Sequence, residues 1–482
     1  MIENNKYQVV IGLEVHTQLL TNSKLFCGDS AAFSTDPNTH ISPITLAHPG
    51  TLPKMNTRAI EYAIKLGLAL HCEIEQHNYF ARKNYFYPDL PKGYQVSQHT
   101  TPICKNGFVT IKVGEAERNI RLNRIHIEED AGKSLHDIDE NYTAIDLNRA
   151  GVPLLEIVSE PDLHSSEEAF AYITELRKLV SWLGICDGNM EEGSMRCDAN
   201  ISIRLAGETR LGTRVEVKNL NSIRNVKRAI DVEVKRLIEI TEKGEKIIQE
   251  TRSYDADNNT SFSLRTKEDA DDYRYFPDPD LSPFLITDDL LAEIQAGLPV
   301  LPNVLISRYT SELHLSAYDA TVLCDDKEQV VYFEELIKHT YNYKAAANWM
   351  LGPVKSYLNE HNTGFKEFTL APVKIAKLIS MVEEGKLGFS IASSKVFAEL
   401  LKDPGKDPLE IATALNLLQE NDSSSIEQWI NEVITKMPDK VTQYKTGKKG
   451  LMGLFAGEVK RLSKGKADMQ IVNKLLEEKL ND

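Results

Sequence analysis

The chain has 482 residues, a net charge of −15 and a hydrophobic fraction of 41%. This length predicts about three domains, and the composition allows each an ordinary globular core. The acidic balance argues against a protein that coats nucleic acid. No apolar run reaches the ~18 residues of a membrane span, and the first residues lack a signal-peptide pattern, so we expect a cytoplasmic protein that enters no membrane.

The six cysteines are dispersed, and no two of them form a CxxC pair. Structural zinc sites usually draw ligands from such closely spaced pairs, so this kind of site is not expected. Dispersed cysteines in a large chain indicate reduced thiols, most of them buried.

The first predicted element is a strand in "VIGLEVHTQL", residues 10–19. Strand side chains alternate between two faces, so Glu14 and His16 share the face opposite the apolar residues. A single strand of this kind most often presents a solvated sheet face. The alternative is that Glu14 and His16 form half of a metal site, with the other ligands on later strands.

Similar patterns recur in "RIHIEED", "PLLEIVSE", "MRCDANISIR" and "TRVEVK", all within the first 285 residues. These segments carry His126, Glu128, Glu129, Glu156, Arg196, Asp198, Asn200, Glu216 and Lys218. Each strand alone is compatible with a wet sheet face. Together, the carboxylates and imidazoles suit Mg²⁺ or Mn²⁺, and the arginines suit phosphates. A metal would also allow many acids to crowd one face.

An amphipathic helix is predicted after the loop "NLNS", with its apolar stripe at Ile223, Val226, Ile230, Val234 and Leu237. Free backbone N–H groups at its start could hold a phosphate. The commoner alternative is an ordinary capped helix.

Two proline-rich stretches, residues 275–283 and 402–408, divide the chain. We therefore predict an α+β domain over residues 1–285, a helical domain over 286–405 and a helical tail over 406–482. Caps support the helices. Thr287 opens a helix that Gly297 ends, Thr369 opens one that Gly385 ends, and Asp407, Pro408 and Glu410 open a third.

The tail reverses the overall charge. Residues 440–466 hold eight Lys or Arg against one acid, a local charge of +7 (eight minus one). Two helices are expected, with apolar stripes at Leu451, Leu454, Phe455, Val459 and Leu462, and at Ile471, Val472, Leu475, Leu476 and Leu480. A lysine-rich run is usually just a solvated surface. The alternative is a phosphate-binding surface formed by Lys448, Lys449, Lys460, Arg461 and Lys464.

Several common site motifs are absent from the sequence. It contains neither GxxxxGK[ST] nor GxSxG, so P-loop nucleotide binding and a nucleophile-elbow serine are not expected. No glutaminase-type cysteine and no amidase-type serine pair is evident.

Six stretches are long and distinctive: "RKNYFYPDLPKGYQVSQ", "IHIEEDAGKS", "DLNRAGVPLLEIVSEPD", "MEEGSMRCDANISIR", "EVKNLNS" and "DDYRYFPDPD". In this order they closely resemble the B subunits of tRNA-dependent amidotransferases, the GatB family, and the resemblance covers nearly the whole chain. It implies a cradle domain related to glutamine synthetase, a helical domain and a small helical tail that binds tRNA.

The resemblance also implies an activity. Proteins of this family are ligases that use ATP to convert Glu-tRNA(Gln) to Gln-tRNA(Gln), or Asp-tRNA(Asn) to Asn-tRNA(Asn). They work with an amidase-like A subunit that supplies ammonia and with a small C subunit. By this resemblance Glu14, His16, Glu129 and Glu156 are catalytic ligands of Mg²⁺ or Mn²⁺. Arg196, Asp198, Glu216 and Lys218 are candidates for substrate or phosphate binding, and the choice between direct and indirect metal contact for Glu128, Asp198 and Glu216 stays open.

Two other functions remain as alternatives. A non-catalytic tRNA-binding scaffold would use the polar sheet face only for docking, although clustered carboxylates repel RNA. A metal-dependent phosphoesterase would use the same ligands for hydrolysis.

Overall fold

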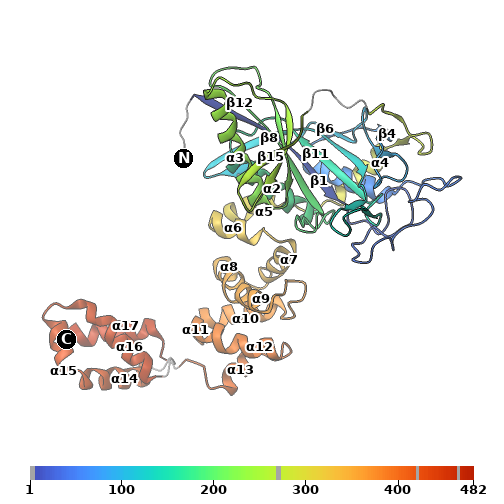
Figure 1. Cartoon of the computed structure of the whole chain (residues 1–482). Coiled ribbons are helices and arrows are strands. Elements are labelled where there is room, and N and C mark those ends of the chain that lie inside the picture. The colour runs from blue at the N-terminus through green and yellow to red at the C-terminus, as the bar shows by residue number, and fades with distance from the viewer. Residues whose placement is uncertain (1–5, 267–272, 420–422, 464–466, 482) are drawn as a thin grey trace. The chain divides into compact units, whose positions relative to one another are not determined.

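The structure is a computed structural model that describes residues 6–266, 273–419, 423–463 and 467–481. Its internal contacts divide the chain into two compact units, Met1–Leu301 and Pro302–Asp482. Figure 1 shows that strands gather in the first unit and that the second is helical. The predicted α+β class with a helical C-terminal region is confirmed. None of the helices in the described part of the chain is long and apolar enough to cross a bilayer.

The first unit is built on a ten-stranded sheet in the order β15-β14-β13-β12-β1-β11-β8-β6-β2, with β7 paired to β8. Its strands are β1 (Tyr7–Gln18), β2 (Glu73–Ile74), β6 (Cys104–Lys105), β7 (Phe108–Val113), β8 (Ala116–Glu129), β11 (Pro153–Ser159), β12 (Met195–Leu205), β13 (Val215–Leu220), β14 (Glu250–Asp255) and β15 (Thr260–Thr266). The pairing of β13 with β14 is parallel and the other pairings are antiparallel. The sheet is therefore mixed.

The two faces of this sheet differ in the way that the alternation of β1 predicts. Ile11, Leu13 and Val15 are buried in the main core, whereas Glu14 and His16 are only partly covered. The core also includes residues of α1 (Thr57–Ala69), α2 (Ser166–Trp182) and α3 (Ile223–Glu242), whose caps are Asn56, Ser165 and Ser222. The helices thus stabilise the apolar face by burying it, and the polar face is left for the site.

Shorter pairings surround the main sheet. They are β16 (Phe276–Pro277) with β4 (Ala81–Asn84) and β5 (Tyr94–Ser97), β9 (Lys133–Leu135) with β10 (Ala144–Asp146), and β3 (His77–Asn78) with β17 (Phe284–Leu285). The last helix of the unit, α4 (Asp288–Ala296), has the predicted caps Thr287 and Gly297. Because α4 packs against α1, the first unit extends to Leu301, past the predicted boundary at 285.

The second unit consists of helices. They are α5 (Pro302–Ser311), α6 (Ala317–Leu323), α7 (Lys327–Leu336), α8 (Tyr343–Trp349), α9 (Lys355–His361), α10 (Pro372–Glu383), α11 (Phe389–Ile391), α12 (Phe397–Lys402), α13 (Pro408–Ala414), α14 (Ser423–Lys436), α15 (Pro438–Lys445), α16 (Met452–Leu462) and α17 (Met469–Asn481). Some of them are joined by two short π-helical segments, η1 (Met350–Val354) and η2 (Ala392–Val396), and by one 3₁₀-helical turn, η3 (Lys449–Leu451).

One helix start and one domain assignment differ from the predictions. The N-cap of α10 is Ala371 rather than Thr369, because Pro372 provides the first helical position without needing an N–H partner. Asp407 does cap α13, with its side chain accepting from the backbone N–H of Leu409. However, α13 packs against α10 and α12, so it belongs with the middle helices and not with the tail predicted over residues 406–482.

Helices α14–α17 share a core of their own. Phe455 and Val459 of α16 and Val472, Leu476 and Leu480 of α17 are buried in it, as both apolar stripes predict. Leu454 is an exception, since 42% of its surface is exposed. We refer to residues 423–481 as the tail.

The six cysteines are free, and Cys72 is the one that is not fully buried. This confirms the expectation of reduced, mostly buried thiols.

Candidate metal and phosphate site

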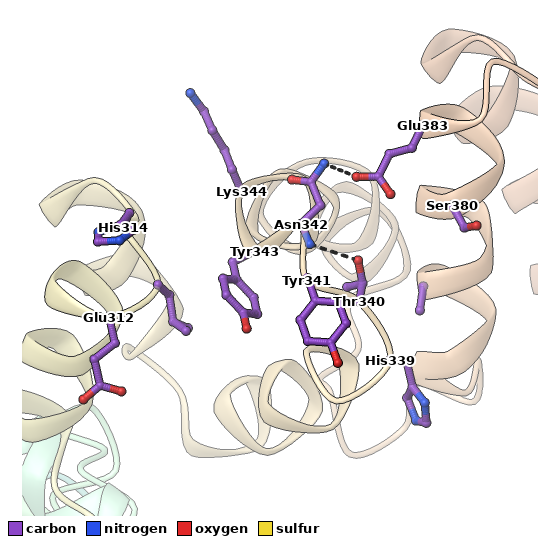
Figure 2. Close-up of a pocket in the computed structure, with 12 residues that line it drawn as sticks. Glu312, His314, His339, Thr340, Tyr341, Asn342, Tyr343, Lys344, Ser380 and Glu383 are labelled. Carbon is purple, nitrogen blue, oxygen red and sulfur yellow. Dashed lines mark hydrogen bonds between the residues drawn. The ribbon is translucent and has the colours of Figure 1, made fainter.

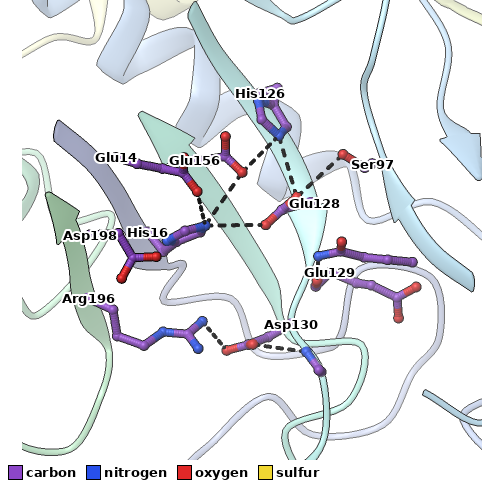
Figure 3. A network of polar contacts seen from close by, with 12 residues as sticks. Glu14, His16, Ser97, His126, Glu128, Glu129, Asp130, Glu156, Arg196 and Asp198 are labelled. Carbon is purple, nitrogen blue, oxygen red and sulfur yellow. Dashed lines mark hydrogen bonds and ion pairs between the residues drawn. The ribbon is translucent and has the colours of Figure 1, made fainter. Parts of the chain in front are cut away.

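Four polar residues on adjacent strands stand directly opposite one another. The register pairs His126 of β8 with Glu156 of β11, Glu156 with His16 of β1, and His16 with Arg196 of β12. Opposite residues in an antiparallel pair have Cβ atoms about 5 Å apart, so these side chains must meet on one face. Two residues away on β1, and on the same face, Glu14 pairs with Asp198 of β12. We call Glu14, His16, His126, Glu128, Glu156 and Asp198 the acidic cluster, which Figure 3 shows beside Arg196.

His16 lies at the centre of the acidic cluster. Its Nε2 atom is 3.6 Å from Glu14 Oε1, 3.7 Å from Glu128 Oε1 and 3.5 Å from Glu156 Oε2. These separations are too long for good hydrogen bonds. They are close to the ~3 to 4 Å spacing between ligands that share one cation with ligand distances near 2.1 Å.

Two overlapping sets of donor atoms could hold a cation. In Glu14, His16 and Asp198, and again in His16, Glu128 and Glu156, the donor atoms lie within 4.8 Å of one another. A set of carboxylate oxygens with an imidazole suits Mn²⁺ better than Mg²⁺, but both ions accept these ligands. The chemistry of the donor set therefore fits the predicted metal.

The protonation states reflect the crowding of acids. Burial would lower the pKa of His126, but Glu156 and Glu128 outweigh it and raise that pKa to about 9. Burial also opposes the charge of His16, whose pKa is nevertheless raised by Glu156 and its other acidic neighbours. Conversely, burial and Glu156 raise the pKa of Glu14. The raised pKa of each imidazole favours its protonated form, whose positive charge offsets the surrounding carboxylates.

Positive groups extend the same face toward β12 and β13. Arg196 donates to Asp130 Oδ2 at 2.8 Å, and Lys218 forms ion pairs with Asp198 and with Glu216. The Nε atom of Arg196 is buried and has no hydrogen-bond partner within the described residues. Such a donor fits an oxygen of a bound phosphate, because leaving it unsatisfied costs about 1–3 kcal/mol.

Asp130 is a site residue that was not predicted from the sequence. It is 3% exposed, and although burial opposes its charge, Arg196 and Arg149 hold its pKa below the usual value. Gln18 also donates to it at 2.6 Å. The run of three acids at 128–130 was the available signal, but nothing local reveals that Asp130 anchors Arg196.

The structure does not bring Glu129 into the acidic cluster. On β8 it points to the face opposite Glu128, where Lys92 donates to its carboxylate at 2.7 Å and the Val96 N–H donates at 2.7 Å. Burial raises the pKa of Glu129, and the charge of Lys92 opposes that effect. Strand alternation separates adjacent residues, so the predicted set of Glu14, His16, Glu129 and Glu156 does not converge as a group, and Glu128 takes the fourth place.

The start of α3 resembles an ordinary cap. The Ser222 hydroxyl accepts from the Asn225 N–H at 3.1 Å, so one of the N–H groups considered for a phosphate already has a partner. This supports the commoner alternative for that helix.

A separate cavity of about 830 Å³ lies in the second unit and is lined by residues of the α5–α6 and α7–α8 loops and of α10. Figure 2 shows its polar contacts, in which Asn342 donates to Glu383 Oε1 at 2.5 Å and to Thr340 through its backbone N–H at 3.2 Å. Asn342 thus links the α7–α8 loop to α10 at one side of the cavity.

The predicted basic residues of the tail are exposed where they are described. Lys448 and Lys460 are exposed, Lys449 lies 4.2 Å above the ring of Tyr444, and Arg461 pairs with Glu458 at 2.8 Å. Lys464 lies outside the described residues.

Comparison with known proteins agrees with the resemblance. Residues 9–292 match the family described as the GatB/GatE catalytic domain, and residues 331–480 match the GatB domain. A protein of Pelodictyon phaeoclathratiforme is 50% identical over 98% of this chain and 99% of its own length. Proteins of Thermodesulfovibrio yellowstonii and Geotalea uraniireducens are 46% and 49% identical, over 98% and 99% of this chain and 98% and 100% of their own lengths. All three are named as the B subunit of aspartyl/glutamyl-tRNA(Asn/Gln) amidotransferase.

Proposed function

Because the chain belongs to the GatB/GatE family, we propose that it is the B subunit of a tRNA-dependent amidotransferase, a ligase of protein biosynthesis. Its substrates are Glu-tRNA(Gln), Asp-tRNA(Asn) or both. The observation that carries this proposal is the acidic cluster beside Arg196 and Lys218, on a chain that matches its relatives over nearly its full length. The mixed sheet with one polar face also agrees with a catalytic cradle of the glutamine-synthetase type.

The chemistry requires activation of a carboxylate, which is a poor electrophile. A side-chain carboxylate oxygen of the aminoacyl group attacks the γ-phosphorus of ATP, and ADP leaves. Ammonia then attacks the acyl carbon of the resulting acyl phosphate, and inorganic phosphate leaves. No protein nucleophile is needed, so catalysis consists of positioning and charge stabilisation.

Residues of the acidic cluster would hold the metal ions: Glu14, His16, Glu128, Glu156 and Asp198. Bound Mg²⁺ or Mn²⁺ would supply charge neutralisation for the phosphates of ATP. Arg196, held by Asp130, has a buried Nε available for a phosphate oxygen. Lys218, held between Asp198 and Glu216, presents a second positive charge on the same face.

His126 has a positioning role in this arrangement. Its Nε2 lies 3.4 Å from both Glu128 Oε2 and Glu156 Oε2, so it holds two carboxylates of the cluster in place. Groups that orient ligands in this way contribute to metal affinity without touching the metal.

Ammonia must come from a partner, since the sequence has neither a glutaminase-type cysteine nor an amidase-type serine pair. We therefore assign this chain to a complex with an amidase-like A subunit and a small C subunit. This division of labour predicts no glutamine hydrolysis by the pure chain.

The decisive experiment measures ADP formation and amidated tRNA with the purified chain and its A and C partners. We expect ATP consumption that depends on misacylated tRNA, and amidation with either glutamine or a high concentration of free ammonia. A scaffold would consume no ATP, and a phosphoesterase would release phosphate without misacylated tRNA. Glutaminase activity of the isolated chain would contradict the division of labour.

A further inference from the structure

A row of aromatic rings lies near the acidic cluster and has no part in the chemistry above. In order the rings are His99, Tyr275, Tyr273, Tyr85 and Tyr87, with centroids 4.0, 6.1, 6.1 and 5.8 Å apart. His99 and Tyr275 are stacked, and the other pairs meet edge to face. We call these five residues the aromatic row.

The small β16–β4–β5 sheet brings these distant segments together. Tyr85 follows β4, Tyr275 precedes β16, and the main chain of Asn84 donates to the Tyr273 carbonyl at 3.0 Å. The side chain of Asn84 also donates to the Arg274 carbonyl at 2.8 Å. The inner rings of the aromatic row are thus fixed by backbone contacts, which gives the row a defined position.

One end of the aromatic row adjoins the acidic cluster. Ser97 donates to Glu128 Oε2 at 3.4 Å, as Figure 3 shows, and His99 lies two residues further on. Burial raises the pKa of Tyr275 to about 12, and the charges of Glu128 and Glu156 add to that rise. Tyr275 therefore lies within electrostatic range of two carboxylates of the acidic cluster.

The other end is open to solvent, and a positive charge lies over the inner rings. Tyr87 is 60% exposed and the adjacent Phe86 is 82% exposed. Lys83 Nζ lies 4.9 Å from the ring centroid of Tyr273 and 5.9 Å from that of Tyr85. Rings that only packed the small sheet would not need such exposure. Exposed aromatic faces beside a cation are the groups that bind unpaired nucleotides.

We propose that the aromatic row, with Phe86, binds the unpaired 3′ nucleotides of the aminoacyl-tRNA and leads its aminoacyl end to the acidic cluster. This rests on the proposed function, because the carboxylate to be phosphorylated is attached through an ester to the terminal ribose. The 3′ nucleotides must then adjoin the site where ATP reacts. A surface with several rings fits a run of bases, whereas the single adenine of ATP needs only one.

The test uses the assembled enzyme with a misacylated tRNA that carries a fluorescent base analogue at its 3′-terminal nucleotide. Tyr87→Leu should raise the KM for tRNA roughly 5- to 150-fold, the range for loss of one base–aromatic stack, and should weaken quenching of the analogue. Tyr87→Phe keeps the ring and should behave like the wild type. Tyr318→Leu, at a tyrosine that is 75% exposed on α6, is the matched control and should change neither value.

The KM for ATP separates the two possible sources of a stacked base. It should stay within twofold of the wild-type value in Tyr87→Leu and in a second variant, Phe86→Ala. A rise in the KM for ATP without a rise for tRNA would assign the row to the adenine of ATP and overturn the proposal. Unchanged KM for tRNA and unchanged quenching in both folded variants would also overturn it. Failure of the wild type to amidate any tRNA would instead refute the proposed function, and quenching would still report on the row.

Discussion

Glu128 and Glu129 are adjacent on β8 but have different electrostatic partners. Glu128 faces His16 and His126 in the acidic cluster, whereas Glu129 faces Lys92 on the other side of the strand. The side chain of Glu129 is fully buried, and that of Lys92 is 9% exposed. A buried ion pair of this kind is costly to break, because the remaining charge loses its compensation.

We therefore predict different defects for the two glutamine substitutions. Glu128→Gln should weaken Mn²⁺ binding at least tenfold, because it removes a charged donor, and should lower the free energy of unfolding less than Glu129→Gln does, because the other carboxylates crowded around Glu128 repel its charge. Glu129→Gln should lower the free energy of unfolding by about 3 kcal/mol and leave Mn²⁺ binding intact. Calorimetric titration and urea unfolding measure both quantities, and Lys92→Met in the Glu129→Gln background should recover part of the stability. Loss of Mn²⁺ binding in folded Glu129→Gln would show that this assignment is wrong.

Lys24 is a buried lysine of the first unit. It is 0% exposed, and its Nζ donates to the Leu147 carbonyl at 3.2 Å. Burial lowers its pKa to about 8, although acidic neighbours such as Asp29 oppose the effect. The folded state therefore disfavours the charged form, and this penalty persists at neutral pH.

Because the pKa of Lys24 is lower in the folded than in the unfolded chain, its contribution to stability increases with pH. Between pH 8 and about 10.4 the unfolded chain binds more protons at this lysine than the folded chain, so this group adds stability as the pH rises. Lys24→Met should remove that contribution, on the order of 2–3 kcal/mol over the interval. Urea unfolding at several pH values measures the difference between the wild type and the variant. Lys112→Met, at an exposed lysine of β7, is the control. If it changes the dependence of the unfolding free energy on pH as much as Lys24→Met does, the effect is not due to burial of Lys24.

Strand register explains how much of the site could be predicted from the sequence. Alternation correctly placed Glu14 with His16 and His126 with Glu128, because side-chain direction is a local property. It could not reveal which strands are neighbours, since β1 pairs with β11 and β12, both more than 130 residues away. The resemblance selected Glu129, whereas alternation groups Glu128 with His126. Asp130 and Lys92 were missed because their roles depend entirely on such long-range contacts.

Helices, like strands, were predicted in their local features but not in their long-range packing. The stripe of α3 and the caps of α4 and α13 were predicted correctly, because they depend on neighbouring residues. The assignment of α13 to the middle helices depends on its contacts with α10 and α12, which no local pattern records.

A buried ionic network fixes α3 to the β14–β15 hairpin. Glu233 of α3 is 0% exposed and accepts from Arg236 Nε and from the Ser261 hydroxyl, each at 2.9 Å. Arg252 Nε lies 3.5 Å from the same carboxylate and its NH1 group donates to Glu250 at 2.7 Å. Two strands at one edge of the catalytic sheet therefore depend on one buried carboxylate.

Glu233→Gln should destabilise this edge. Removing the charge leaves two arginines under-compensated, so we expect the free energy of unfolding to fall by about 3 kcal/mol. Hydrogen exchange should increase first in β14 and β15, and urea unfolding gives the magnitude. Glu239→Gln, at an exposed glutamate of the same helix that lies 4.0 Å from Lys235, should change stability by less than about 0.5 kcal/mol. Similar losses in both variants would contradict a special role for Glu233.

At the scale of the whole molecule, charge is distributed unevenly. The chain carries −15 overall, yet residues 440–466 carry +7 (eight bases minus one acid). The first unit concentrates carboxylates in the acidic cluster, the proposed site for metal and phosphate, and carboxylates by themselves repel RNA. A basic surface elsewhere in the chain would therefore strengthen the binding of a tRNA substrate, and the exposed tail residues Lys448, Lys449 and Lys460 provide one.

The tail can be tested as a unit because its helices bury a core of their own. The packing of α13 moves the cut from Asp407 to residue 419, so that the middle helices stay complete. Deleting residues 420–482 should raise the KM for tRNA, since phosphate contacts supply much of the affinity for nucleic acid, while ATP binding and assembly with the amidase-like partner are retained.

Single charge removals in the intact chain refine that test. Lys448→Gln and Lys460→Gln should each weaken tRNA binding without sequence preference and flatten the salt dependence of log K by about one unit. Lys402→Gln, at an exposed lysine of α12 that pairs with Glu399, is a control that removes the same charge outside the tail. Arg461 should matter less than Lys460, because its guanidinium already pairs with Glu458 and a phosphate would have to compete for it. If the truncated enzyme keeps the wild-type KM for tRNA while folded and assembled, the basic surface of the tail is only a solvated helix face.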